Sequence, residues 1–94
     1  MTNPKIDRAG NKQWFNSIGQ CHREDGPAVM RPNGDKVWYQ NGKRHRLDGP
    51  ALEYPDGKCY YFINDNWLTG DEWNAHPLRI EYVIKENLKL ILND

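Results

Sequence analysis

The stretch HRLDGPALEYPDG, residues 45–57, decides the fold because it is a near copy of HREDGPAVMRPNG, residues 22–34. The two copies are 23 residues apart, and the same shift also pairs Trp38 with Tyr61. A fixed period of about 20 to 50 residues is typical of stacked supersecondary units. We therefore expect a repeated structural unit between residues 13 and 67.

Each unit carries the dipeptide of a tight turn between short runs of β-branched and aromatic residues. Asn33-Gly34 and Asp56-Gly57 are preferred where both central turn residues have positive φ, and they predict one hairpin in each unit. Asn41-Gly42 and Asn64-Asp65 supply further turns, so that the chain continues as a meander. An earlier strand is expected over residues 13–17, which include two adjacent aromatic residues. The predicted pairings are residues 28–31 with 36–40 and residues 51–54 with 58–63.

Helix signals follow the last hairpin. Thr69 and Glu72 have the spacing of a capping box, in which each side chain bonds a backbone N–H of the first helical turn. Pro77 cannot continue a helix that starts there. The sequence therefore predicts a short helix over residues 70–75.

The last segment, residues 78–92, fits two structures. As a hairpin, Ile80, Tyr82 and Ile84 alternate on one strand, and Leu88, Leu90 and Leu92 alternate on the next, around a turn at residues 85–87. As a helix, at 100° per residue, five apolar side chains share a face opposite the charged ones. We expect the helix, because a stack of hairpins needs a terminal cap and a helix laid on the stack hides its apolar face. The shared face consists of Ile80, Val83, Ile84, Leu88 and Ile91.

The fold class expected from these elements is mainly β: consecutive antiparallel β-hairpins, capped by a short helix and a C-terminal helix. A chain of 94 residues is one domain by the usual length prior and has a small core. We divide this single domain into an N-terminal extension over residues 1–12, β-hairpin repeats over 13–67 and a helical cap over 69–94.

Composition restricts the function classes. Thirteen Lys and Arg balance thirteen Asp and Glu, so no net field steers the protein to nucleic acid or to an anionic membrane. The first residues lack the apolar run of a signal peptide, and two cysteines are too few for a disulfide scaffold. We expect a cytoplasmic protein that makes no membrane contact.

The repeated His-Arg-x-Asp-Gly-Pro phrase has a catalytic and a structural interpretation. A histidine three residues before an aspartate offers a base and its orienting partner. The structural interpretation is a corner: the Asp carboxylate accepts nearby backbone amides and pairs with the Arg, the Gly allows an otherwise costly φ, and the Pro fixes the entry into the next strand. We favour the corner, because an enzyme needs one asymmetric site. The corner residues are His22, Arg23, Asp25, Gly26, Pro27, His45, Arg46, Asp48, Gly49 and Pro50.

A zinc site is not expected. Cys21-His22, His45 and Cys59 offer two thiols and two imidazoles, but adjacent Cys and His lack the usual gap between zinc ligands. Neither cysteine belongs to the repeated plan, because Cys21 aligns with Arg44 and Cys59 with Lys36. We expect no cofactor and no enzymatic activity.

The stretch WYQNGKRHRLDGPALEYPDGKCYYF, residues 38–62, resembles the MORN repeat, a 23-residue β-hairpin unit. It is closer to the HRxDGPA variant found in proteins of large bacteriophages, although Arg23 and Arg46 stand where ordinary MORN repeats have glycine. The resemblance covers about residues 14–67. It implies scaffolding or binding in place of catalysis, and a small phage protein that binds and modulates a bacterial host protein such as a polymerase, a nuclease or a defence factor.

The partner surface is expected on aromatic and basic side chains around the repeat. One member of each adjacent aromatic pair in a strand faces outward, and exposed Tyr, Trp and Arg are the usual anchors of interfaces. Two alternatives stay open: nucleic-acid binding through basic residues interleaved with aromatic ones, and a homo-oligomer that pairs open sheet edges. The candidate partner-binding residues are Trp38, Tyr39, Lys43, Arg44, Arg46 and Tyr61.

Overall fold

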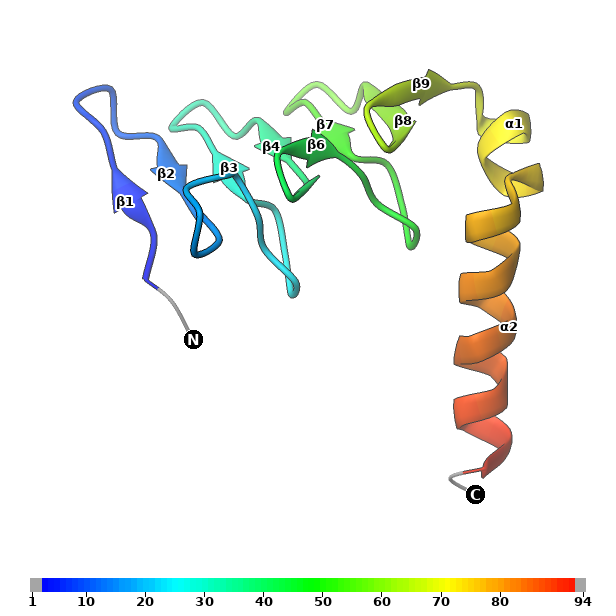
Figure 1. Ribbon diagram of the computed structural model, residues 1–94. Helices are drawn as coiled ribbons and strands as arrows, with labels where there is room; N and C mark the ends of the chain where they lie inside the picture. The colour runs from blue at the N-terminus through cyan, green and yellow to red at the C-terminus, as the bar shows by residue number, and fades with distance from the viewer. Residues whose placement is uncertain (1–2, 93–94) are drawn as a thin grey trace.

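The computed structural model describes residues 3–92, so the outermost residues of the predicted extension and cap, 1–2 and 93–94, lie outside the described residues. The fold is mainly β, as predicted: a seven-stranded antiparallel sheet in the order β1-β2-β3-β4-β7-β8-β9, a two-stranded sheet β5-β6, and two helices (Figure 1). The elements are β1 (Lys5–Ile6), β2 (Lys12–Gln13), β3 (Val29–Met30), β4 (Lys36–Val37), β5 (Tyr39–Gln40), β6 (Lys43–Arg44), β7 (Leu52–Glu53), β8 (Cys59–Ile63), β9 (Asn66–Leu68), α1 (Gly70–Ala75) and α2 (Pro77–Leu92).

The two predicted hairpins are present. β3 pairs with β4 and β7 with β8, both antiparallel, and the shorter observed strands lie inside the predicted ranges. The sheet also extends toward the N-terminus, because β1 lies in the range assigned to the extension and pairs with β2, which begins at the last residue of that range.

The expected turn geometry is wrong at both Asn33-Gly34 and Asp56-Gly57. In each dipeptide only the glycine has positive φ, 103° at Gly34 and 93° at Gly57. Pro32 occupies the first central position of the turn and holds φ near −65°, so the turn cannot have positive φ at both central residues. The Gly34 N–H donates to the Arg31 carbonyl at 3.0 Å, and the Arg31 N–H donates to the Asp35 carbonyl at 2.9 Å. Glycine takes the left-handed position after the turn.

The turns with two successive positive φ values lie elsewhere. Asn41 and Gly42 have φ of 50° and 82°, and Asn64 and Asp65 have φ of 51° and 70°. They close smaller hairpins, in which β5 pairs with β6 and β8 with β9. Each long hairpin of the sheet therefore leads into a smaller one.

A backbone ladder through two buried alanines connects the hairpins. The Trp14 N–H donates to the Ala28 carbonyl at 2.9 Å, and the Trp38 N–H donates to the Ala51 carbonyl at 2.8 Å. Both alanines are completely buried. The buried apolar residues are Trp14, Ala28, Val29, Val37, Ala51, Phe62, Ile63 and Trp73.

The short helix α1 closes the C-terminal end of this core. Its predicted capping box is confirmed: the Glu72 N–H donates to Thr69 Oγ1 at 3.2 Å and the Thr69 N–H donates to Glu72 Oε1 at 2.9 Å. The Trp73 ring packs on Tyr61 with centroids 4.6 Å apart, and its Nε1–H donates to the Arg46 carbonyl at 3.0 Å.

The predicted C-terminal helix is confirmed as α2, but the expectation that it hides its apolar face on the stack is wrong. None of its residues is buried. His76, between the helices, has extended backbone (φ −68°, ψ 134°), and Pro77 begins α2 in a new direction. Trp73 provides the cap, and α2 extends away from the sheet (Figure 1).

We predict that Trp73→Ala lowers the free energy of unfolding by about 3–5 kcal/mol, because it leaves a cavity against Tyr61 and an unpaired carbonyl at Arg46. Trp73→Phe keeps most of the packing and loses the hydrogen bond, so it should cost about 1–2 kcal/mol. Urea unfolding followed by circular dichroism measures both. A Trp73→Phe variant as stable as wild type would contradict the role of the indole N–H, whereas equal costs for the two variants would contradict the role of the packing on Tyr61.

Candidate functional site

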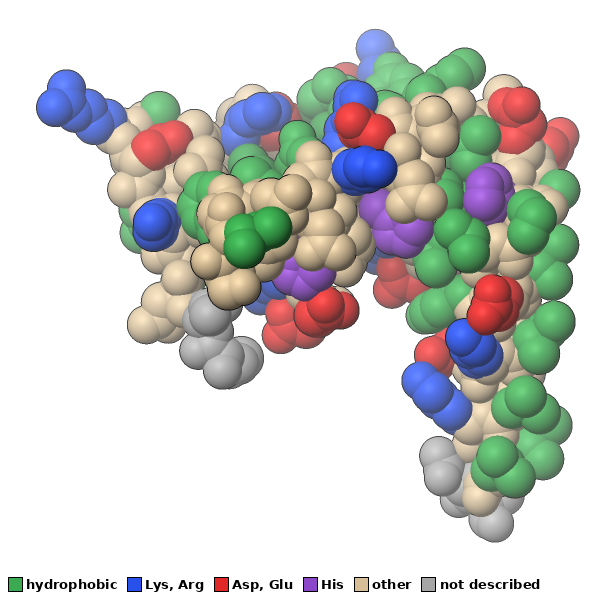
Figure 2. All heavy atoms as spheres, in the orientation of Figure 1, with side chains coloured by type: hydrophobic (Ala, Val, Ile, Leu, Met, Phe, Trp, Pro, Cys, Tyr) green, Lys and Arg blue, Asp and Glu red, His purple; other side chains and the backbone are tan. Residues whose placement is uncertain are grey.

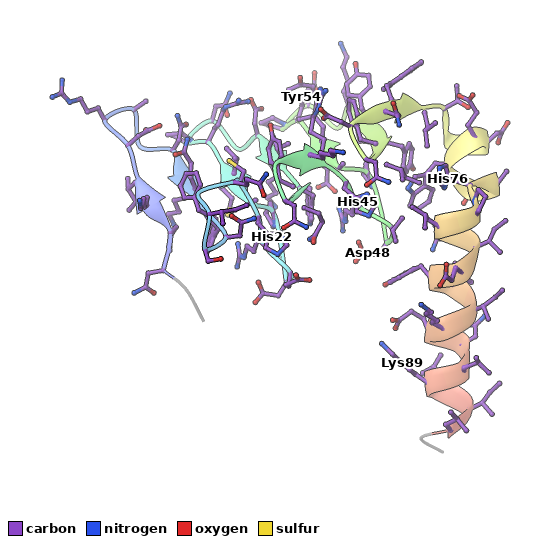
Figure 3. All side chains as sticks on the ribbon, in the orientation of Figure 1. His22, His45, Asp48, Tyr54, His76 and Lys89 are labelled. Carbon is purple, nitrogen blue, oxygen red and sulfur yellow. The ribbon has the colours of Figure 1, made fainter. Side chains whose placement is uncertain are left out.

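The two histidines of the repeated phrase make the same backbone contact in successive units (Figure 3). His22 Nδ1 accepts the Asn41 N–H at 3.0 Å, and His45 Nδ1 accepts the Asn64 N–H at 3.1 Å. Each bond reaches the turn of the next small hairpin. Because Nδ1 is the acceptor, each ring has its proton on Nε2 when neutral, and Nδ1 is not free to act as a base.

The first arginine of the phrase is enclosed on several sides. Arg23 Nε donates to Asp25 at 3.0 Å, Nη1 donates to the Pro27 carbonyl at 3.1 Å, and the guanidinium lies 3.9 Å from the Trp14 ring centroid. Its backbone carbonyl accepts Nε2–H of Gln40, from the next unit, at 2.8 Å.

The second arginine repeats these contacts. Arg46 Nε donates to Asp48 at 2.8 Å, Nη1 donates to the Pro50 carbonyl at 3.0 Å and to Glu53 at 3.0 Å, and the guanidinium lies 3.9 Å from the Trp38 ring centroid. A guanidinium over an aromatic face gains cation–π attraction in addition to its hydrogen bonds. The expected pairing of arginine and aspartate is therefore present in both copies.

Two details of the predicted corner are wrong. The carboxylates of Asp25 and Asp48 accept the Nε–H of their arginines where we expected backbone amides. Neither Gly26 nor Gly49 has positive φ. These glycines are needed for space, because a Cβ would lie 3.1 Å from the guanidinium carbon at Gly26 and 2.8 Å from it at Gly49.

A groove of about 810 Å³ separates the two corners. The loops that carry them project to the same side of the sheet as α2 (Figure 1). Tyr82 of α2 also lines the groove. The lining residues used below are Glu24, Asp25, Trp38, Arg46, Asp48 and Tyr82.

The charged groups that this groove exposes most to solvent are carboxylates, although Asp25 and Asp48 are paired with arginines and Glu24 Oε1 lies 2.7 Å from His22 Nε2. The side chains of Glu24, Asp25 and Asp48 are 80%, 65% and 57% exposed, whereas those of Arg23 and Arg46 are 24% and 19% exposed. The positive charges are therefore covered by the rings on which they stack, and the carboxylates form the rim.

A smaller hollow of about 480 Å³ lies beside the first corner, lined by Trp14, Phe15 and residues 22–25 among others. It resembles the main groove but has a corner on one side only, because the described residues contain no corner before His22. Of these two hollows, the main groove is the one lined by both corners and by α2.

Only part of the predicted partner-binding set lies in the groove. Trp38 and Arg46 line it together. Tyr61 instead packs on Trp73. Arg44 is bound to Asp65 at 2.6 Å and lies 4.3 Å from the Phe62 ring centroid. Tyr39 is half-buried and Lys43 is exposed; neither lines the groove.

Sequence reasoning missed the contributions of the C-terminal helices. Tyr82 lines the groove from α2, and the Arg79 guanidinium lies 4.3 Å from the Trp73 ring centroid. The signal was present in the helical pattern, because Tyr82 is the one aromatic residue on the polar side of that pattern.

Within residues 3–92, no group of three or more His, Cys, Asp or Glu side chains is arranged to hold a metal ion. Cys59 is exposed, and burial raises the pKa of the Cys21 thiol. In the same part of the chain, neither helix has the length and apolar character needed to cross a bilayer.

Comparisons with known proteins identify no relative: no family model matches the chain, and no curated protein or solved structure matches it.

The environment of His45 predicts a pH-dependent stability. Burial, and secondly the positive charge of His76, lower the pKa of His45 below its ordinary value of 6.5. The unfolded chain therefore binds a proton at a higher pH than the folded protein does. The stabilisation is fully present above about pH 6.5 and is lost as the pH falls through the folded pKa.

We predict that the urea concentration at the unfolding midpoint decreases as the pH is lowered from about 6.5, within the range above that in which the carboxylates titrate. In His45→Gln this slope should shrink. An unchanged slope in the variant would assign the effect to another group.

We predict that Gly49→Ala lowers the free energy of unfolding by about 1–3 kcal/mol, because the new Cβ displaces a guanidinium held by Asp48, Glu53 and Trp38. Gly26→Ala is the matched control: it has more room and should cost less. Chemical unfolding measures both. If Gly49→Ala stabilises the protein, as Gly→Ala does at unstrained sites, the close approach is not limiting.

Proposed function

We propose that the chain is a noncatalytic protein-binding module and that its groove takes a basic segment of a partner protein. The observation that carries this proposal is the exposed carboxylate rim of Glu24, Asp25 and Asp48 around the aromatic walls of Trp38 and Tyr82. Lys or Arg side chains of a partner complement the rim, and their aliphatic stems pack on the rings.

The contacts of the corners favour binding over catalysis. A general base needs a free lone pair within reach of a substrate, but Nδ1 of His22 and of His45 each accepts a backbone N–H. Asp25 and Asp48 are engaged by arginines. Such saturated contacts support a rigid corner that holds the groove walls in position.

The identity of the partner follows from the sequence resemblance. Equivalent residues of the two phrases make equivalent contacts, which supports the interpretation as a 23-residue MORN-like repeat. On the HRxDGPA variant, we propose a small phage protein that acts in the cytoplasm of the infected bacterium. Its target is then a host protein, such as a polymerase, a nuclease or a defence factor.

Two other functions have less support. Nucleic-acid binding needs free basic groups, whereas Arg44 is paired with Asp65 and Arg46 with Asp48 and Glu53. Assembly through the β1 edge of the sheet is disfavoured because β1 has two residues, includes Lys5 and follows Pro4, and such features blunt an edge.

The test is a pull-down with the tagged chain from nuclease-treated bacterial lysate, read by mass spectrometry. We predict that wild type retains one dominant protein and that Glu24→Lys and Tyr82→Ala lose it, because they change the rim charge and the wall of the groove. Asp71→Lys makes the same charge change on α1, outside the groove, and should retain the partner. Increasing salt should weaken capture by wild type.

Retention of the same protein by Glu24→Lys and Tyr82→Ala would assign the contact to another surface. Loss of capture in all variants, with circular dichroism unchanged, would remove the groove as an explanation. A folded wild-type chain that captures no protein, but binds labelled single strands, would favour the nucleic-acid alternative.

A further inference from the structure

Helix α2 presents its apolar stripe to solvent. Ile80, Ile84, Leu88 and Ile91 are 46%, 54%, 50% and 68% exposed. In Figure 2 the hydrophobic side chains of this helix lie along the edge that faces away from the sheet, and charged side chains lie on the inner side. Soluble proteins rarely leave such a continuous apolar surface without a partner.

The inner side of α2 is mostly polar. Val83, at its border with the stripe, is half-buried. Arg79, Tyr82 and Glu86 are half-buried as well; the Arg79 guanidinium contacts the Trp73 ring, and Tyr82 lines the groove. At 100° per residue these positions lie opposite the stripe. The helix thus docks by its polar side, the reverse of an ordinary surface helix, and turning it toward the sheet would remove Tyr82 from the groove.

The order of residues in the stripe is self-complementary. The stripe is symmetric about Ile84: Ile80 and Leu88 lie four residues on either side, and Pro77 and Ile91 lie seven residues on either side. When two such helices pair antiparallel about a two-fold axis at Ile84, each Ile80 meets Leu88 of the other copy. A two-fold interface requires this kind of self-matching surface.

The charges beside the stripe fit the same arrangement. Glu81 and Lys85 lie on one flank and are bound to each other at 2.8 Å. In an antiparallel pair this flank meets the same flank of the other copy, so that Glu81 of each copy lies near Lys85 of the other. The chain has no net charge, and two copies therefore do not repel each other as a whole.

We propose that α2 is a dimerisation element, through which two copies of this chain pair antiparallel about Ile84. A helix of 16 residues is about 24 Å long and offers less than the roughly 800 Å² per partner of a standard interface. The dimer is accordingly weak and dissociates on dilution. This interface is separate from the groove and does not depend on the proposed target.

The experiment is analytical ultracentrifugation of the full chain over about a hundredfold range of concentration. Wild type should shift from monomer to dimer. Ile84→Lys puts two like charges at the axis and should raise the dissociation constant by roughly a hundredfold or more. Glu86→Lys makes a charge change on the inner side and should dimerise as wild type does.

A charge exchange tests the antiparallel arrangement. Glu81→Lys alone should weaken the dimer, because four lysines then meet on one flank, and adding Lys85→Glu should restore it. Circular dichroism checks that each variant keeps its helix content.

A wild type that stays monomeric throughout would overturn the proposal, as would a dimer unaffected by Ile84→Lys. Failure of the double variant to recover would overturn the antiparallel pairing. A third outcome is that wild type stays monomeric and binds phosphatidylcholine–phosphatidylglycerol vesicles, and that Ile84→Lys abolishes this vesicle binding. That result would assign the stripe to a lipid surface and overturn the dimer. None of these outcomes depends on capture of a target by the groove.

Discussion

The stacking of an arginine on the aromatic ring of its own unit is the interaction on which the rest of the structure depends. Arg23 on Trp14 and Arg46 on Trp38 each join a corner loop to a strand. The planar guanidinium can stack with its face while its edges donate hydrogen bonds to the Asp carboxylate and the Pro carbonyl. A lysine in its place would keep the charge and lose both the stack and the forked hydrogen bonds. The small core can support long loops because these arginines hold them.

The backbone carbonyl of the corner arginine accepts a hydrogen bond from a different donor inside the stack and at its end. The Arg23 carbonyl accepts a hydrogen bond from Gln40 of the next unit, and the Arg46 carbonyl accepts one from Trp73 of α1. Helix α1 thus provides the contacts of a following unit and ends the series. Arg79 over Trp73 continues the pairing of arginine with an aromatic ring. Because Trp73 takes the place of a following unit, the stack ends after the second corner and the Arg46 carbonyl still has a hydrogen-bond donor.

Local patterns predicted most of the local structure, and most of the errors concern contacts between distant residues. The hairpin ranges and the capping box depend on neighbours in sequence, and they agree with the structure. The turn at Asn33-Gly34 differs from the one that its dipeptide predicts, because Pro32 fixes φ at the first central position. The role of Gly49 depends on where Arg46 lies, and the outward face of α2 depends on the junction at His76; neither has a signature in hydrophobic periodicity. Tyr82 lines the groove because the junction at His76 sets the direction of α2.

The direction of α2 connects the two surfaces of the molecule. Because the helix docks through Arg79 and Tyr82, its polar side completes the groove while its apolar side stays outside. A helix with its stripe turned inward would bury more apolar area and would lose the wall of the groove. In the dimer that we propose, the two grooves lie on opposite sides of the paired helices, because each faces the inner side of its own α2. Two sites held in this way raise the effective concentration of the second for a partner with two basic segments, so a weak dimer is sufficient to strengthen binding.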